Sequence, residues 1–549
     1  MADNSRTSPP AQWWRDAVIY QVYLRSFADG NGDGVGDLAG LRQRLPHLAE
    51  LGVDAIWLNP WYPSPMADAG YDVADHRDIE PTFGTLAEAE KFVEEAHAAG
   101  IRVVIDLVPN HSSTEHTWFV DALAGGPGCA ARELFWFRPG RGPGGELPPN
   151  GWQSRFGGPA WTRVTERDGT PGEWYLHLYS PQQPDLNWTN PAVRAEFEDI
   201  LRFWLDRDVD GFRIDVADGL VKADGLPEVA AEGGPLPYSD QDGVHEIYRS
   251  WRRIADGYGG RRVLVGELWL PDSERFARYL RPDELHSAFN FDFLCCAWDS
   301  AALRGVIDAT LAAHAPVGAA PTWVLSNHDV TRHVTRYGRA DTSFDFGNRQ
   351  HGAPTDRPLG TRRARAALLL TMALPGGAYV YQGEELGLWE VEDLPDELRQ
   401  DPVWVRSGHT DRGRDGCRVP VPWGGAEPPF EFSPADATAP PWLPQPADWH
   451  ANTTSAQAAD PTSMLALYRA ALRLRRAEPG LGDGDGELRW SASAADGVLA
   501  FDRPPGLRCV VNLSPAPIPL PANESVLLAS APLAGDRLPP DTAAWLRVR

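Results

Sequence analysis

Acidic residues stand at the ends of several short apolar runs of this 549-residue chain. Asp106, Asp215, Glu267 and Asp329 each close or follow such a run, although they are far apart in the sequence. A single buried acid is often structural, but several in one place are costly unless they are paired or used. Two carboxylates beside one bond can cleave a glycoside, one by attacking the anomeric carbon and one by supplying a proton. The pattern therefore predicts a glycoside-cleaving centre.

The neighbours of two of these acids suggest how the chemistry is divided. Arg213 stands two residues before Asp215, so both side chains would point to one side of a strand, where the guanidinium would keep the carboxylate ionised. Glu267 is followed by Leu268 and Trp269, an apolar setting that would favour a protonated carboxyl. We therefore predict Asp215 as the nucleophile and Glu267 as the general acid/base.

Short apolar runs that alternate with amphipathic helices must position these residues. Such alternation predicts βα units and a parallel sheet covered on both faces. Eight strands close a (β/α)₈ TIM barrel, and the catalytic residues of such barrels lie at the C-terminal ends of the strands. The expected strands are residues 17–22, 53–58, 102–108, 211–216, 262–268, 287–291, 322–325 and 378–381.

Two helices carry clear start signals. Thr85 and Glu88 form a capping box before residues 87–99. Asn190 caps a second helix, with Pro191 at its first position.

Three stretches break the barrel pattern. Residues 111–184 hold Gly- and Pro-rich runs too long for a bare loop, which predicts a small irregular domain inserted after the third strand. Residues 384–459 are again rich in proline and predict long loops over the barrel mouth. Residues 479–549 read as short strands, at 487–490, 498–502, 509–513 and 525–529, and predict a small antiparallel β-sandwich. The barrel itself is expected over residues 1–110 and 185–478.

The charge of the chain limits its partners. A formal charge of −25 argues against nucleic acid or an anionic membrane, both of which need a basic surface. No stretch approaches the roughly 18 apolar residues of a membrane span. The five cysteines lack metal-binding spacing, and residues 1–14 do not resemble a signal peptide, so we expect reduced thiols and a cytoplasmic protein.

Four segments resemble the signature regions of glycoside hydrolase family 13, the α-amylase family. They are DLVPNH at 106–111, GFRID at 211–215, VGE at 265–267 and SNHD at 326–329, in the order of the family. The chain is most similar to the α-glucosidase and oligo-1,6-glucosidase branch, and in particular to α-glucosidases of actinobacterial type. The resemblance implies a retaining mechanism that needs no organic cofactor.

The resemblance also implies roles for individual residues. Asp215 would be the nucleophile, Glu267 the general acid/base and Asp329 the carboxylate that stabilises the transition state. His111, Arg213 and His328 would bind the glucose in the scissile subsite. Asp72, in a Gly-Tyr-Asp segment, and Arg418 would clasp its 4-hydroxyl and close the pocket, making the enzyme exo-acting on small oligosaccharides. Without the resemblance, His111 and His328 would each be interpreted as ordinary core histidines, and Asp72 as an ordinary surface acid.

The loop at residues 29–37 (DGNGDGVGD) carries oxygen ligands at alternate positions. Its twelfth position is Gly40 instead of glutamate, so it is not an EF-hand. Similar loops in the glucosidase branch bind structural Ca²⁺, which implies as ligands Asp29, Asn31, Asp33, the carbonyl of Val35, and Asp37. An unoccupied polar glycine turn is the alternative.

Several alternatives remain open. Val216, after the nucleophile, resembles oligo-1,6-glucosidases, whereas the overall likeness is to enzymes that cleave maltose-type α-1,4 bonds. Sucrose, isomaltose and transfer of glucose to another sugar are further alternatives, as is an isomerase of the same family. A non-catalytic family member would lack intact motifs. The sequence leaves open whether the protein is a monomer or a homodimer.

Overall fold

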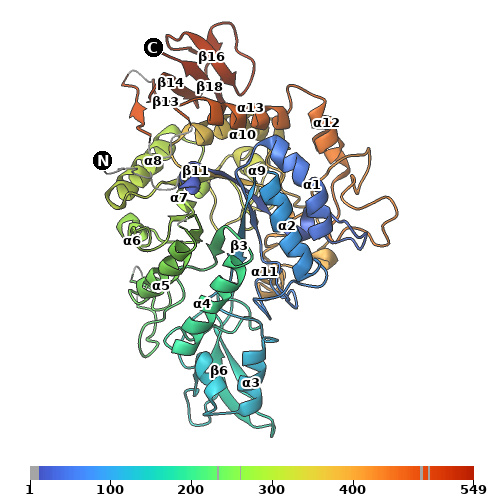
Figure 1. The fold of residues 1–549 in the computed structure, drawn as a ribbon, viewed down its shortest axis with the longest axis vertical. Helices are drawn as coiled ribbons and strands as arrows, with labels where there is room; N and C mark the ends of the chain where they lie inside the picture. Colours follow the sequence, from blue (N-terminus) through green and yellow to red (C-terminus); the bar gives the residue numbers. More distant parts are fainter. Residues whose placement is uncertain (1–11, 231–233, 260, 482–485, 493–494) are drawn as a thin grey trace, which may run out of the picture.

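Eight parallel strands form a nearly closed barrel at the centre of the molecule (Figure 1). The computed structural model describes residues 12–230, 234–259, 261–481, 486–492 and 495–549. Neighbouring strands pair in the order β10-β11-β1-β2-β3-β7-β8-β9, and the Thr322 hydroxyl of β10 donates to the Ala288 carbonyl of β9 across the remaining gap. The barrel strands are β1 (Val18–Val22), β2 (Ala55–Leu58), β3 (Arg102–Leu107), β7 (Gly211–Ile214), β8 (Val263–Gly266), β9 (Ser287–Ala288), β10 (Thr322–Val324) and β11 (Gly377–Tyr381).

The (β/α)₈ prediction is confirmed, with all eight strands at the expected places. The sixth strand is shorter than expected because Asn290 caps α7, which begins at Phe291. Alternate residues of each strand face opposite sides. Ile19, Trp57, Val104 and Val265 belong to one apolar cluster inside the barrel, and their strand neighbours pack under the surrounding helices.

Helices surround the barrel, and most of them begin at a capping side chain, with α5 and α9 as exceptions. The predicted capping box is present, since the Thr85 hydroxyl accepts from the Glu88 N–H and Glu88 accepts from the Thr85 N–H. Asn190 likewise accepts from the Ala192 N–H. The helices are α1 (Leu38–Leu51), α2 (Leu86–Ala98), α4 (Pro191–Leu205), α5 (Val244–Gly257), α6 (Ser273–Arg278), α7 (Phe291–Cys295), α8 (Ser300–His314), α9 (His333–Tyr337), α10 (Arg357–Ala373), α11 (Pro402–Arg406), α12 (Thr454–Ala458) and α13 (Met464–Ala477).

The segment inserted after β3 is more regular than the sequence predicts. It holds α3 (Thr117–Gly125) and an antiparallel sheet of β4 (Phe137–Arg138), β6 (Pro171–Leu176) and β5 (Trp161–Thr165). A small cluster of Trp136, Trp152 and Trp161 with Leu176 and Leu178 stabilises it. Those tryptophans are spread among glycines and prolines, so no periodic pattern revealed the sheet. The insertion projects at one end of the long axis (Figure 1).

A C-terminal β domain lies at the opposite end of the long axis (Figure 1). Its antiparallel sheet has the order β12-β13-β14-β18-β16, and β15 (Ile518–Pro519) pairs with β17 (Arg537–Leu538) in a second, two-stranded sheet. The predicted antiparallel domain is confirmed. Its main strands are β12 (Arg489–Trp490), β13 (Val498–Arg503), β14 (Leu507–Asn512), β16 (Ser525–Ala529) and β18 (Thr542–Arg547).

The proline-rich segment after β11 folds against the first loop of the barrel. The Trp423 indole N–H donates to the Phe27 carbonyl at 2.7 Å, and the Thr438 N–H donates to the Gly32 carbonyl at 2.8 Å. These contacts let the long segment cover the barrel without much secondary structure of its own.

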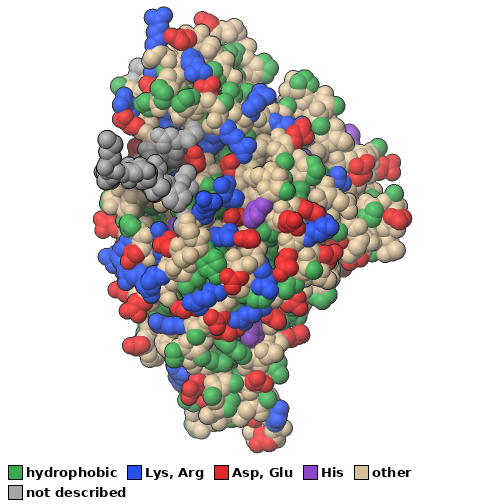
Figure 2. Space-filling view, in the orientation of Figure 1, with side chains coloured by type: hydrophobic (Ala, Val, Ile, Leu, Met, Phe, Trp, Pro, Cys, Tyr) green, Lys and Arg blue, Asp and Glu red, His purple; other side chains and the backbone are tan. Residues whose placement is uncertain are grey.

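Acidic and basic side chains are interspersed over the face in Figure 2. No helix in the described ranges is long and apolar enough to cross a membrane. All five cysteines are free thiols.

Candidate active site

One guanidinium joins three carboxylates at the C-terminal ends of β3, β7 and β8. Arg213 Nη1 donates to Asp106 Oδ1 at 2.8 Å and to Asp215 Oδ1 at 2.6 Å, while its Nη2 pairs with Glu267 Oε2 at 2.8 Å. Arg213 is only 2% exposed and Asp106 is fully buried. The barrel therefore brings together Asp215 and Glu267, the two predicted catalytic acids, around one cation.

The electrostatics of this cluster differ from the expectation for Asp215. Burial raises the pKa of Asp215 well above its usual range, and the nearby Glu267 and Asp106 add to that effect against the attraction of Arg213. Burial also raises the pKa of Asp106 to about 6. Arg213 favours the ionised form of Asp215, as the sequence predicts, but three carboxylates share this one guanidinium. A proton on this cluster belongs to the interacting acids together.

Glu267 lies among hydrogen-bond donors and not in the apolar setting that the sequence suggests. Its Oε2 accepts from the Val216 N–H at 3.0 Å as well as from Arg213, and its Oε1 accepts from the Trp269 indole N–H at 3.0 Å. The apolar expectation was wrong because Leu268 turns into the core while Trp269 turns back toward Glu267. Val216 has φ of 46°, a strained conformation for a β-branched residue, and its N–H reaches Glu267.

Asp329 is held as an anion on the other side of the site. Its Oδ1 contacts Arg414 Nη1 and Arg418 Nη2, both at 3.0 Å, and its Oδ2 lies 3.4 Å from His328 Nε2. Burial opposes ionisation, but these neighbours outweigh it and hold the pKa of Asp329 well below its usual range. Burial also keeps His328 neutral by lowering its pKa far below normal, so the lasting attraction comes from the two guanidinium groups.

The acid–arginine pair that closes the site is not the expected one. Asp72 is fully buried, and its carboxylate accepts from the Ser64 hydroxyl and from the N–H groups of Ala67 and Asp68, which closes its own loop. Arg414 Nη2 instead donates to Asp68 Oδ1 at 2.7 Å.

Arg418 lies behind Asp329 and does not line the cavity. Its guanidinium reaches Asp329 and donates to the His328 carbonyl at 2.8 Å. The structure therefore corrects the Asp72–Arg418 pair to Asp68–Arg414. Asp68 stands four residues before Asp72 in the same segment, and only the closed loop shows which of the two carboxylates is free to pair.

The two predicted histidines flank the tyrosine of that segment. His328 Nε2 lies 2.8 Å from the Tyr71 hydroxyl, its ring is stacked on Tyr71, and its Nδ1 lies 2.8 Å from the amide of Gln21. His111 Nε2 lies 3.2 Å from the Tyr71 carbonyl and 3.0 Å from the amide of Gln183. Burial lowers the pKa of His111 to about 4, so it is neutral.

A cavity of about 480 Å³ reaches Glu267 and Asp329, whereas Asp215, Arg213, His111 and His328 are not among its lining residues. It is large enough for a small organic ligand. Its polar and charged lining includes Glu267, Asp329 and Arg414, and aromatic side chains that the sequence analysis did not single out complete it. Its further lining residues are Arg155, Phe156, Leu178, Tyr179, Val216, Asp218, Gly219, Leu236, Tyr238, Ser239, Trp269, Phe346, Arg349, Val403 and Asp411.

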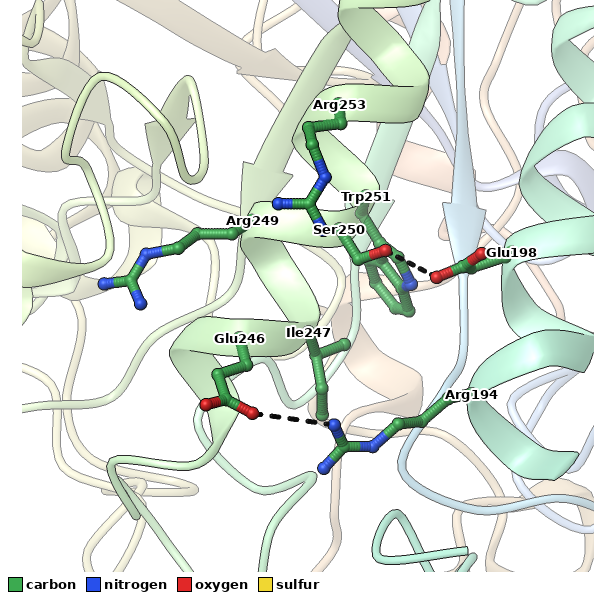
Figure 3. A pocket seen from close by; sticks show the side chains of 8 residues that line it. All are labelled: Arg194, Glu198, Glu246, Ile247, Arg249, Ser250, Trp251 and Arg253. Carbon is green, nitrogen blue, oxygen red and sulfur yellow. Dashed lines mark hydrogen bonds and ion pairs between the residues drawn. The ribbon is translucent and has the colours of Figure 1, made fainter. Parts of the chain in front are cut away.

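A second depression, of about 370 Å³, lies between α4 and α5 (Figure 3). Arg194 faces Glu246 at 3.8 Å there, and the Ser250 hydroxyl donates to Glu198. None of the predicted catalytic or binding residues lines it. Two contacts join the helices across it, and it lacks the predicted acids, so it is not the candidate active site.

The loop at 29–37 is ordered by its own backbone. Asp29 accepts from the N–H groups of Gly32 and Gly34, and Asp37 accepts from Gly30 and Gly40 and caps α1. Within the described ranges, no three side chains of His, Cys, Asp or Glu form a ready metal site. The three aspartates of the expected Ca²⁺ site therefore do not form such a cluster by themselves in the described part of the chain.

Family models match nearly the whole chain. One described as "Alpha amylase, catalytic domain" matches residues 21–484, and one described as a domain of unknown function, DUF3459, matches residues 483–545. The first spans the barrel and its insertion, and the second spans the C-terminal β domain.

Individual proteins are similar over most of their length. A probable α-glucosidase of Rhizobium meliloti (strain 1021) is 37% identical over 93% of this chain and 91% of its own. An oligo-1,6-glucosidase of Parageobacillus thermoglucosidasius is 34% identical, over 84% of each chain. The crystal structure of the α-glucosyl transfer enzyme XgtA superposes with a TM-score of 0.83 at 35% identity, covering 98% of this chain and 100% of that one.

Proposed function

The chain belongs to the α-amylase family, glycoside hydrolase family 13, and from that premise we propose that it is a retaining, exo-acting α-glucosidase. Its substrates are short α-glucosides, from whose non-reducing end it releases glucose. The single observation that carries the proposal is the contact of one guanidinium, Arg213, with both Asp215 and Glu267 at the barrel mouth.

The geometry suits a two-step displacement. Carboxylates that share one guanidinium lie close together, which favours the short separation of a retaining pair over the longer one that leaves room for water. Asp215 attacks the anomeric carbon while Glu267 protonates the leaving oxygen, and a glucosyl ester forms on Asp215. Glu267 then takes a proton from water, which attacks the same carbon and frees Asp215.

Asp329 supports this reaction as a permanent anion. The sugar ring gains positive charge in the transition state, and an ionised carboxylate beside it lowers the barrier. Arg414 and Arg418 maintain that ionisation.

The pocket is proposed to take one terminal glucose because Arg414, which lines it, is held in place by its pair with Asp68. Both residues are buried, and Arg414 also pairs with Asp329 and Asp401. A planar guanidinium and a carboxylate at fixed positions can bind adjacent hydroxyls of a terminal sugar. A chain continuing past them would collide with this pair, which supports exo-action.

The proposal is tested by incubating the purified protein and its Asp215→Asn variant with maltose, isomaltose and sucrose. Wild type should release glucose from at least one sugar, and the variant should be inactive on all three. Chromatography of the products also identifies the cleaved linkage. A wild type inactive on all three would contradict the exo-glucosidase proposal.

Transfer of glucose to another sugar is the second candidate. It is favoured by the 35% identity with an α-glucosyl transfer enzyme over 98% of this chain. The same glucosyl ester serves both reactions, and only the acceptor differs. Products larger than the substrate in the same chromatograms would establish transfer.

We also propose that the 29–37 loop binds a structural Ca²⁺. All of its donors are oxygens, the type that Ca²⁺ prefers. Burial raises the pKa of Asp37 to about 6 and the nearby Asp29 adds to it, a repulsion that a cation would relieve.

The calcium proposal predicts that chelation lowers the Tm of the protein and that added Ca²⁺ restores it. Asp33→Asn keeps the side-chain shape but removes a charge, so it should abolish this response. A wild-type Tm that ignores both chelator and Ca²⁺ would rule the site out.

A further inference from the structure

Among the described residues, each hydrogen bond or ion pair to the Glu267 carboxylate comes from a hydrogen-bond donor. Arg213 and the Val216 N–H occupy Oε2, and the Trp269 indole N–H occupies Oε1. Donors stabilise the charged form of a carboxylate. The donor to Oε1, Trp269, lies two positions after Glu267 and has no role of its own in the proposed reaction.

The Trp269 ring is held rigidly. It stacks on Phe291 with ring centroids 3.7 Å apart and planes within 1°, and the ring of Phe346 meets it edge-on at 4.9 Å. Trp269 also lines both the active-site cavity and a second cavity of about 280 Å³, which Phe291 lines as well. Because the terminal torsion of a glutamate is soft, a donor on a fixed ring decides how the carboxylate is turned.

We propose that Trp269 is a positioning residue that fixes the orientation of the Glu267 carboxylate. The inference rests on the proposed retaining function, in which Glu267 acts first as an acid and then as a base. The indole N–H assists the second step by holding the ionised carboxylate in the orientation in which it takes the proton of the attacking water. It opposes the first step, in which Glu267 must carry a proton.

Other charged and titratable groups act on Glu267 from the surrounding elements. Asp106 on β3, Arg213 on β7, Asp215 after β7, Asp218 in the following loop and Tyr179 of the insertion all interact with it. These groups stay in place when only the indole N–H is removed. A change confined to that N–H therefore isolates its contribution.

The test compares variants by pH profile and by rescue with azide. Trp269→Phe removes the indole N–H and keeps an aromatic ring. If Trp269→Phe does not fold, Trp269 is instead replaced by the tryptophan analogue with sulfur in place of the indole N–H, which keeps the shape of the ring. Either change should move the basic limb of the kcat/KM profile for the preferred disaccharide upward by about 0.5–1 pH unit, the size expected for losing one donor.

The second step gives an independent readout. With an α-glucoside of 4-nitrophenol, whose leaving group needs little protonation, kcat should fall by about 3–10-fold in the variants, the effect of roughly one hydrogen bond. Azide should restore the rate, because it attacks the glucosyl ester through nitrogen without losing a proton, and glucosyl azide should accumulate. The matched control Phe291→Leu keeps the indole N–H and should leave the basic limb in place.

The outcomes separate this inference from the proposed function. An active wild type with an unmoved basic limb in both N–H-deleted variants overturns the role of Trp269 alone. A basic limb that moves as far in Phe291→Leu assigns the effect to packing and overturns it as well. A wild type that cleaves no α-glucoside overturns the proposed function and this inference with it.

Discussion

Asp68 and Asp72 stand four residues apart, both buried, yet their surroundings give them different tasks. Asp68 contacts Arg414, a residue that lines the cavity, whereas Asp72 accepts three hydrogen bonds within its own loop. Burial raises the pKa of Asp68 to about 6 against the attraction of Arg414 and Arg418. A bound sugar hydroxyl and Arg414 would both stabilise its charge, so substrate and arginine act on one carboxylate.

This difference predicts opposite effects of one substitution at the two positions. Asp68→Asn should reduce kcat/KM for the preferred disaccharide by about 10–100-fold, since a charged hydrogen bond to substrate is worth about 1.5–3 kcal/mol, with little change in Tm. Asp72→Asn should lower the Tm and leave the kcat/KM of the folded enzyme within a few-fold. Steady-state kinetics and thermal unfolding of both variants check this, and equal effects on kcat/KM would contradict it.

The sequence predicted which acids gather at the strand ends but not all of their partners. Asp215, Glu267 and Asp329 are placed by strand ends, and strand ends can be read from apolar runs. The pairing of Asp68 with Arg414 joins residues 346 positions apart through two loops. No local pattern records which carboxylate a loop uses for its own closure, so the pairing could not be predicted.

A buried acid also lies at a strand end away from the cavity, where a helix packs against it. Glu384 follows β11, where its carboxylate accepts from the Tyr381 N–H at 3.1 Å and from the Tyr468 hydroxyl of α13 at 3.2 Å. Burial raises its pKa to about 8, and the adjacent Glu385 adds to the shift. The folded chain therefore holds a proton there that the unfolded chain releases.

This proton predicts how stability depends on pH. Between about pH 4.5 and 8 the folded state binds more protons at Glu384 than the unfolded state, so its contribution to stability falls as pH rises. Glu384→Gln removes that dependence and keeps the hydrogen-bonding shape. Between pH 5 and 9, the free energy of unfolding of the variant relative to that of wild type should increase as pH rises, by a few kcal/mol at most. A difference independent of pH would contradict the shift.

Helix starts and barrel strands were the most predictable elements, because their signals are local. The capping box at Thr85 and the cap at Asn190 follow from three or four residues each. The three-stranded sheet of the insertion was not foreseen, since its strands pair across Gly- and Pro-rich turns and its apolar cluster is assembled from scattered tryptophans. Such a core exists only after the turns bring those rings together.

At the scale of the molecule, the C-terminal domain packs against the barrel through one face of its large sheet. Trp545 of β18 is fully buried and its indole N–H donates to the Leu369 carbonyl of α10 at 2.9 Å. Arg365 and Arg363 of α10 also reach this domain, at the Ser530 carbonyl and at Asp541. The domain thus braces a barrel helix far along the chain from it.

This docking predicts a loss of stability without a loss of chemistry. Trp545→Ala should lower the free energy of unfolding by about 3–5 kcal/mol, the cost of a large buried ring. Val526→Ala, on β16 of the same sheet and 38% exposed, should change it by no more than about 0.5 kcal/mol. Both variants should retain the kcat of wild type at temperatures where they remain folded. A folded but inactive Trp545→Ala would contradict the prediction that this contact stabilises the protein without affecting catalysis.

The central claim is that Asp215 forms a covalent glucosyl ester, and trapping that ester tests it most directly. The protein would be treated with 5-fluoro-α-glucosyl fluoride, which forms the ester quickly and releases it slowly, then digested and analysed by mass spectrometry. We predict one fluoroglucosyl group on the peptide that contains Asp215, and none in Asp215→Asn. A label on another carboxylate, or release of β-glucose from an α-glucoside without any adduct, would contradict the retaining mechanism.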